Sequence, residues 1–195
     1  MIATVQGSMR ERLIEAASEL FYAQGLRAVS VDKVIDRAGT TKVTFYRHFQ
    51  SKDDLIVAYL ESRAEQERNG VDAAIAHGDG DVDASLRLMA EHTGKAACEP
   101  GFRGCPFINA AAEYPDPDSP VRKVVDAHRA WWTSAFERLV APLGLADPTA
   151  IADDLMLLRD GIMVAGYLGD PSNVAASFLR SCQAVLHCAA RADAR

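Results

Sequence analysis

The chain has 195 residues, of which 49% are hydrophobic and 7% aromatic, a composition that supports an ordinary aliphatic core and argues against wholesale disorder. No apolar run is long enough to cross a membrane, and the opening MIATVQGSMRER lacks the apolar stretch of a secretion signal. We therefore expect a cytoplasmic protein with no membrane partner, whose four cysteines are mostly thiols, with pairing of Cys98 and Cys105 left open.

The net charge of −6 is unevenly distributed along the chain. Residues 10–52 carry eight Lys or Arg and five Asp or Glu, whereas the remainder carries thirteen basic and twenty-two acidic residues. A basic N-terminal segment joined to an acidic body is typical of a small nucleic-acid module attached to a larger domain.

Three helices are predicted in the first quarter of the chain. Apolar residues recur with a helical period over 9–23. Ser30 is a favourable N-cap for a second helix over 31–38, which Gly39 ends. A third short helix is expected over 42–49. Two short helices separated by a glycine turn form a helix-turn-helix.

The third of these helices combines two phenylalanines with a crowd of polar residues, in the segment RAGTTKVTFYRHFQSK at 37–52. Phe45 and Phe49 are four residues apart and share one side of the helix, so we expect them to dock it onto the two preceding helices. The remaining side chains then face outward and form a surface suited to contact another molecule: Thr41, Lys42, Thr44, Tyr46 and Arg47.

The rest of the chain is predicted to be helical. Ser51 is expected to cap a long helix that ends near His77, with Asp54 completing the capping box. Further helices are expected over 82–97 and 106–112, and three more at the pairs Ser119-Pro120, Asp147-Pro148 and Asp170-Pro171, where a capping side chain precedes a proline. No segment alternates with a period of two, so the predicted fold class is all-α.

Two segments carry a family resemblance. ELFYAQGLRAVSVDKVIDRAGTTKVTFYRHFQSKDDL at 19–55 resembles the N-terminal region of the TetR family of bacterial transcriptional regulators, and RGCPFINAAAEYPDPDSPVR at 103–122 is similar to a segment of one branch of that family. The resemblance implies a three-helix helix-turn-helix DNA-binding head at 9–52. A six-helix ligand-binding and dimerisation body would follow at 53–195.

The resemblance also implies a homodimer, in which the helices at 148–168 and 171–191 form a four-helix interface. Small residues in these helices would allow the partner helices to approach closely: Ala165, Gly166, Ala175 and Ala176. Packing of these residues inside the subunit is the alternative.

Carried over residue by residue, the resemblance assigns DNA contacts in the head. It places Lys42, Val43, Thr44 and Arg47 near the major groove of a double-stranded operator, Thr41, Tyr46, His48 and Lys52 near phosphates, and Ser30 as a further backbone contact. Thr40 precedes the third helix, where free N–H groups suit a phosphate. The family usually has Ser at position 41 and often Gly at 43, which leaves base preference open. Fold support by Tyr46, helix capping by His48 and a solvated Lys52 are the alternatives.

The implied body would bind a small, largely apolar effector. The candidate contacts are Met89, Phe107, Asn109, Trp131, Trp132, Met163 and Tyr167, with His92, His128 and Arg159 as polar groups. Core packing is the alternative for each Trp and Met and for His128. A buried Arg159 would need a partner. Asp160 is expected to face elsewhere, which leaves Glu113, another carboxylate or an anionic effector.

The resemblance thus implies a homodimeric repressor that a small effector releases from a palindromic operator, with activation left open. No catalytic motif of the types HExxH, GxSxG or a glycine-rich phosphate loop is present, so we expect neither an enzyme nor a cofactor. Cys182 and Cys188 are six residues apart on a predicted helix and cannot share a metal. Two alternatives are a redox-sensing DNA-binding regulator that uses Cys98 and Cys105, and a helical partner-binding protein.

Overall fold

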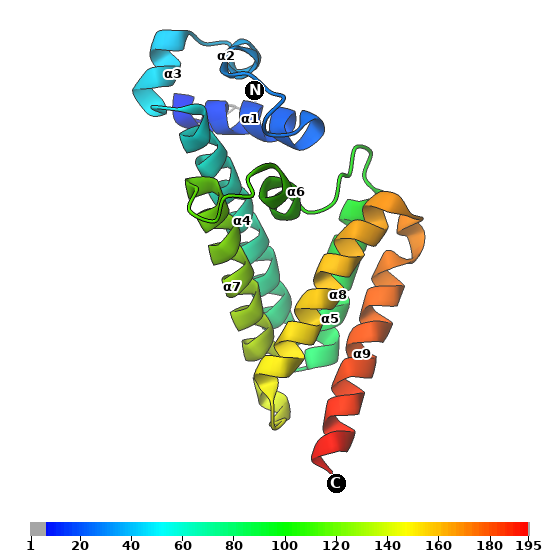
Figure 1. The fold of residues 1–195 in the computed structure, drawn as a ribbon. Helices are drawn as coiled ribbons and strands as arrows, with labels where there is room; N and C mark the ends of the chain where they lie inside the picture. The colour runs from blue at the N-terminus through cyan, green and yellow to red at the C-terminus, as the bar shows by residue number, and fades with distance from the viewer. Residues whose placement is uncertain (1–6, 195) are drawn as a thin grey trace, which may run out of the picture. The chain divides into compact units, whose positions relative to one another are not determined.

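The computed structural model describes residues 7–194, and every regular element within them is helical (Figure 1). Residues 1–6 of the opening stretch, where no secretion signal was expected, lie outside this range. The α-helices are α1 Met9–Gln24, α2 Val31–Ala38, α3 Lys42–His48, α4 Lys52–Gly78, α5 Val82–Cys98, α6 Pro106–Glu113, α7 Pro120–Val140, α8 Pro148–Leu168 and α9 Val174–Asp193. The predicted all-α class is confirmed. None of the described helices is long and apolar enough to span a membrane.

The predicted caps set the helix starts. The Ser30 side chain accepts a hydrogen bond from the Lys33 amide at 3.2 Å. Ser51 and Asp54 form the expected reciprocal box, with amide-to-side-chain distances of 2.9 and 3.1 Å. Asp147 accepts from the Ala150 amide at 3.0 Å. Each bond satisfies an amide that lacks a partner within its own helix.

The predicted start of the last helix at Pro171 is wrong by one turn. The Asp170 side chain accepts from the Ser172 amide at 2.9 Å, only two residues along the chain. This tight local bond accompanies a 3₁₀ turn, η2 Pro171–Asn173, and α9 begins after it at Val174. A second 3₁₀ turn, η1 Ala141–Leu143, follows α7.

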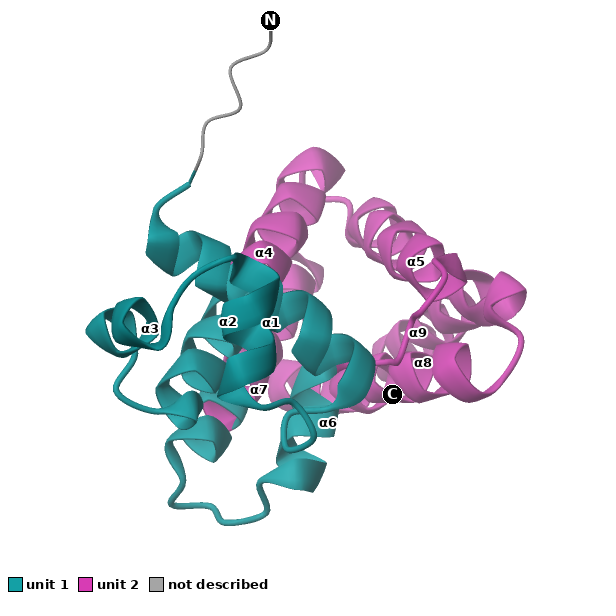
Figure 2. Cartoon of the chain, turned by 90° about the horizontal axis from the view of Figure 1, so that it is seen from above, with its two compact units in different colours: residues 1–64, 106–125 teal, residues 65–105, 126–195 magenta. Residues whose placement is uncertain are grey.

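The chain forms two compact units (Figure 2). The first comprises residues up to 64 together with 106–125, and the second comprises 65–105 together with 126–195. Helices α4 and α7 therefore contribute to both units, while α6 belongs to the first. The predicted division between 52 and 53 does not coincide with these units and stays a prediction.

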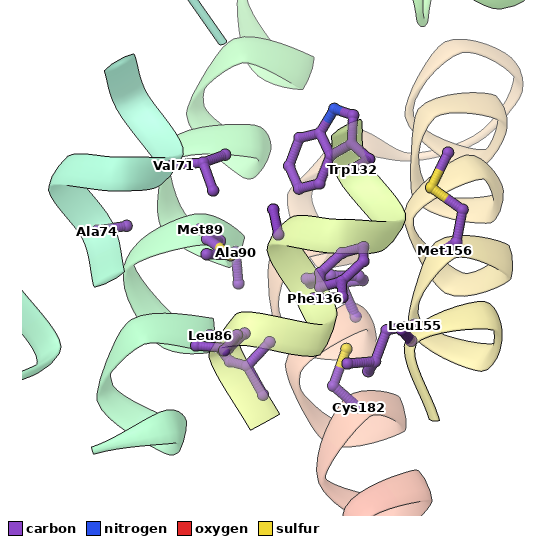
Figure 3. Packing of buried hydrophobic residues seen from close by; sticks show 14 of the residues in the cluster. Val71, Ala74, Leu86, Met89, Ala90, Trp132, Phe136, Leu155, Met156 and Cys182 are labelled. Carbon is purple, nitrogen blue, oxygen red and sulfur yellow. The ribbon is translucent and has the colours of Figure 1, made fainter. Parts of the chain in front are cut away.

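The second unit has a core of interlocking apolar side chains. In Figure 3, Val71 from α4, Met89 from α5, Phe136 from α7 and Leu155 from α8 belong to one buried cluster, which Cys182 of α9 joins. Burial of such side chains contributes about 1.5–3 kcal/mol each, which makes this cluster the main source of stability in the unit.

Small residues allow α5 to lie close to α8 and α9 within the second unit. A Cβ added to Gly94 would lie 2.6 Å from the Cβ of Ala175, and one added to Gly166 would lie 3.0 Å from the Cβ of Ala97. Gly166 and Ala175 thus pack inside the subunit, which is the alternative that the sequence left open. Ala165 and Ala176 are exposed.

Candidate nucleic-acid interface

Helix α3 is anchored by the two phenylalanines. Phe45 and Phe49 are buried, with ring centroids 5.9 Å apart, and the guanidinium of Arg10 lies over the Phe49 ring. The predicted docking role of the pair is confirmed. Phe49 adopts an extended backbone and ends the helix after His48, one residue earlier than predicted.

The opposite side of α3 is turned to solvent. Exposed residues on and beside the helix are Thr41, Lys42, Val43, Tyr46, Arg47 and His48, while Thr40 and Thr44 are half-buried. Val43 is 74% exposed, so the core gives no reason for an apolar side chain at that position. The Tyr46 ring meets the Phe45 ring edge-on, with centroids 5.2 Å apart. Tyr46 therefore has a supporting contact although the residue is exposed.

An exposed ion pair joins α2 to the start of α3. The Lys42 Nζ atom lies 2.9 Å from Asp32 Oδ1. This hydrogen bond to Asp32 raises the pKa of Lys42 above its ordinary value, so the lysine stays protonated. Asp32 was absent from the predicted contacts.

Lys52 and Ser30 flank this surface. The Lys52 ammonium donates to the Arg27 carbonyl at 3.2 Å, and partial burial lowers the pKa of Lys52. Ser30 is exposed and caps α2. Lys52 therefore has a structural contact, and its predicted phosphate contact stays a prediction.

A carboxylate clamp holds the loop between α1 and α2. The two oxygens of Glu113, the last residue of α6, accept from the amides of Leu26 at 2.8 Å and Arg27 at 2.7 Å. In return Arg27 Nε donates to the Glu113 carbonyl at 2.8 Å. Gly25 precedes the clamp with φ of 93°, and a Cβ there would lie 3.1 Å from Glu113 Oε1. The clamp explains why α6 belongs to the first unit.

The next residue, Tyr114, adds a second link in the first unit. Its hydroxyl donates to Asp53 Oδ1 at 2.9 Å, and the Arg27 guanidinium lies 5.3 Å from its ring centroid. Burial and the bond to Asp53 raise the pKa of Tyr114 to about 12. Both links join residues some 60 to 90 positions apart, so periodicity and capping patterns gave no sign of them.

Comparison with known proteins places this geometry in a family. The profile described as bacterial regulatory proteins, tetR family, matches residues 13–59, which include α2, α3 and their exposed surface. The crystal structure of a TetR-family transcriptional regulator from Streptomyces coelicolor is 41% identical and superposes with a TM-score of 0.87. The alignment covers 93% of this chain and 95% of that one.

The chain belongs to the TetR family. It is a DNA-binding transcriptional regulator, as its curated relatives are. The HTH-type transcriptional activator FasR of Mycolicibacterium smegmatis is 39% identical over 66 residues, which span 34% of this chain and 30% of FasR. The HTH-type transcriptional regulator LmrA of Bacillus subtilis is 23% identical over 145 residues, or 74% of this chain and 77% of LmrA.

The second unit of this TetR-family chain contains a buried charge cluster centred on Glu67. Its Oε2 atom accepts from Arg159 Nη2 at 3.0 Å and from Trp132 Nε1 at 3.2 Å, and it lies 3.1 Å from His128 Nε2. The Arg159 guanidinium lies 5.0 Å from the Trp132 ring centroid. The sequence singled out Arg159, His128 and Trp132 but missed the carboxylate that joins them.

The expectation that Asp160 faces away from Arg159 is wrong. Arg159 Nη1 donates to Asp160 Oδ1 at 3.2 Å and to the Cys105 sulfur at 3.3 Å. Adjacent residues on a helix point about 100° apart, but the long guanidinium stem spans that angle. Glu113, which the sequence offered as a partner, instead binds the Leu26 and Arg27 amides.

The other effector candidates are divided between the units. Phe107 is buried and Asn109 half-buried in the first unit. In the second unit Met89 is buried, Trp131 and Met163 are half-buried, and His92 and Tyr167 are exposed. Their contact with an effector stays a prediction.

The cysteines in the part of the chain that the structure describes are free thiols. Cys98 is exposed and Cys105 is buried. No group of three His, Cys, Asp or Glu side chains among the described residues is arranged to hold a metal ion. The comparisons do not favour the redox-sensing alternative.

Proposed function

We propose that this chain is a homodimeric repressor that binds a palindromic operator through α3 and is released by a small, largely apolar effector. The observation that carries the proposal is the surface of α3, where polar residues and one exposed valine surround two buried phenylalanines. Its relatives are regulators, and we propose neither a catalytic activity nor a cofactor. Operator binding would place its action in the cytoplasm.

The proposed DNA contacts fall into two groups. Lys42, Thr44 and Arg47 would reach base edges in the major groove, where Lys and Arg favour guanine, and the exposed Val43 would contact a thymine methyl. The groups proposed to position the head on phosphates, without reading sequence, are Ser30, Thr40, Thr41, Tyr46, His48 and Lys52. In a dimer the two α3 helices would meet half-sites about 34 Å apart.

The operator is sought on DNA flanking the gene, by fluorescence anisotropy with excess nonspecific competitor. We expect competitor-resistant binding that Arg47→Ala weakens by about tenfold or more, the usual effect of losing a base contact. Arg87→Ala, which removes an exposed arginine from α5, is the matched control and should leave affinity unchanged. Equal losses in both variants, or no specific binding by the wild type in a random-sequence selection, would refute operator recognition by α3.

A groove along α8 and α9 supports dimerisation. Its volume is about 840 Å³, and Leu157, Val164 and Leu168 line it, all three exposed despite being large and apolar. A second copy of the chain is the proposed occupant, since an apolar surface on one helix pair suits a four-helix interface. Light scattering should show a dimer for the wild type and a monomer for Leu157→Glu. Leu88→Glu, on exposed Leu88 of α5, should remain dimeric.

Release by an effector requires coupling between body and head. Helix α6 supports such coupling because polar contacts hold the chain at both of its ends. Glu113 at its end clamps the Leu26–Arg27 loop, and Cys105, immediately before its start, accepts from Arg159. An effector that shifts this helix would lower DNA affinity by typically 1–3 kcal/mol, and DNA would weaken effector binding equally.

The effector is sought through tryptophan fluorescence, because both tryptophans of the chain, Trp131 and Trp132, are candidate contacts. A compound that changes this fluorescence saturably should also dissociate the operator complex. In cells it should raise expression of an operator-controlled reporter. A fall in reporter expression would instead identify an activator, as FasR is described to be.

A further inference from the structure

Helices α2 and α3 each contribute one charged side chain to the same exposed surface. Asp32 lies in the first turn of α2 and Lys42 is the first residue of α3. Their charged atoms are 2.9 Å apart, although the two side chains are 62% and 65% exposed. A carboxylate thus lies beside a lysine that is proposed to contact DNA.

This carboxylate, in the first turn of α2, contributes little to stability. Exposed ion pairs contribute little to stability, and α2 and α3 already share a core that includes buried Val34, Ile35 and Phe45. A negative charge on a DNA-binding surface also repels phosphates, so Asp32 disfavours nonspecific attraction. What Asp32 offers to bound DNA is therefore a hydrogen-bond acceptor and not a favourable charge.

We propose that Asp32 and Lys42 together read one C·G base pair in each half of the operator, and this inference rests on the DNA-binding function proposed above. In the major groove a C·G pair presents the cytosine amino group beside the O6 and N7 acceptors of guanine. A carboxylate accepts from that amino group, and an ammonium donates to those acceptors. Asp32 and Lys42 supply this acceptor and donor side by side.

The ion pair also positions the lysine. An ammonium group has three protons, so Lys42 can keep its bond to Asp32 while it donates to guanine. The bond restrains a long side chain that would otherwise reach neighbouring phosphates. Asp32 therefore increases specificity in two ways, because it contacts cytosine and because it keeps Lys42 at the base edge.

The test is a selection of bound sites from a random DNA library with the wild type, Asp32→Ala and Glu19→Ala. The matched control removes an exposed carboxylate of α1 that pairs with Arg37, so both variants lose one negative charge from the same unit. We expect the wild type to select a palindrome with one fixed C·G pair in each half. Asp32→Ala should lose the preference for that C·G pair, which corresponds to a difference of between about 5-fold and 150-fold in affinity. It should keep the base preferences at the other positions of the site.

Other outcomes have distinct meanings. If Asp32→Ala selects the same bases as the wild type at every position, or loses affinity equally for all sequences, the inference is overturned and the operator function stands. An A·T pair at the position that Asp32→Ala relaxes also overturns it, as does equal relaxation by Glu19→Ala. A wild type that selects no sequence refutes the operator function itself, and the inference with it.

Discussion

Two ion pairs of similar chemistry occupy opposite environments in this molecule. Lys42 and Asp32 in the first unit are both exposed at 65% and 62%, whereas Arg159 in the second unit is 4% exposed and its partner Glu67 23%. Water and salt screen the first pair, so it contributes little to stability and leaves both side chains within reach of another molecule. The members of the second pair cannot separate without a large loss of stability, because a buried charge without a partner is strongly destabilising.

The two pairs differ in what their charges do: the exposed pair is available for binding, and the buried pair holds helices together. The exposed surface of α3 holds its charges where another molecule can reach them. The Glu67 cluster holds its charges where they fix the arrangement of α4, α7 and α8 within the second unit. Effects of substitution should therefore be divided between DNA affinity and stability according to burial.

The largest loss of stability is expected for Glu67→Ala. It removes one of the two carboxylates that pair with the buried Arg159 guanidinium, together with the acceptor beside His128 and Trp132. Breaking a buried pair lowers the free energy of unfolding by about 3–5 kcal/mol. Asp72→Ala is the control, because Asp72 lies on the same helix and pairs with Arg138 at the surface. We expect a change within about 0.5 kcal/mol for it. Urea unfolding followed by circular dichroism measures both, and equal losses would contradict the contrast.

A smaller loss is expected at the Glu113 clamp, which is partly exposed. Glu113→Ala removes the bonds to the Leu26 and Arg27 amides. Because the clamp is partly exposed, water can replace the carboxylate, and we expect the free energy of unfolding to fall by about 1–3 kcal/mol in total. Hydrogen exchange should accelerate at those two amides. Glu113→Gln retains one acceptor oxygen and should protect one of them. Unchanged exchange at both amides in Glu113→Ala would show that the clamp does not order the loop.

Acid should weaken the buried cluster around Glu67. Burial alone raises the pKa of Glu67, but the hydrogen bond with His128 and the charge of Arg159 outweigh it, so the pKa lies below its ordinary 4.5. A lowered carboxyl pKa adds stability above the unfolded value, and this stability is lost as pH falls below about 4.5. Unfolding free energy measured against pH should therefore decline more steeply in the wild type than in Glu67→Gln. Parallel curves for the two proteins would show that Glu67 is not the source of the pH dependence.

Local rules were sufficient to predict the head, and they failed where distant residues meet. Capping patterns and helical periodicity placed Ser30, Ser51 and the Phe45–Phe49 pair correctly, because each depends on neighbours within one or two turns. The Glu67–Arg159 pair joins residues 92 positions apart, and no pattern within one helix indicates which carboxylate an arginine meets. Asp32 was also missed, since its partner lies on the next helix.

The smallest stability change is expected for Lys42→Ala. It should leave the urea midpoint at its wild-type value, because the partner of Lys42, Asp32, is an exposed carboxylate. Its operator affinity should nevertheless fall by about tenfold or more, the usual loss for a base contact. Salt dependence separates two causes of that loss. A phosphate contact contributes about 0.9 to the slope of log affinity against log salt, so a lysine held at a base edge by Asp32 should leave the slope unchanged. A slope reduced by that amount would show that Lys42 contacts a DNA phosphate and not a base.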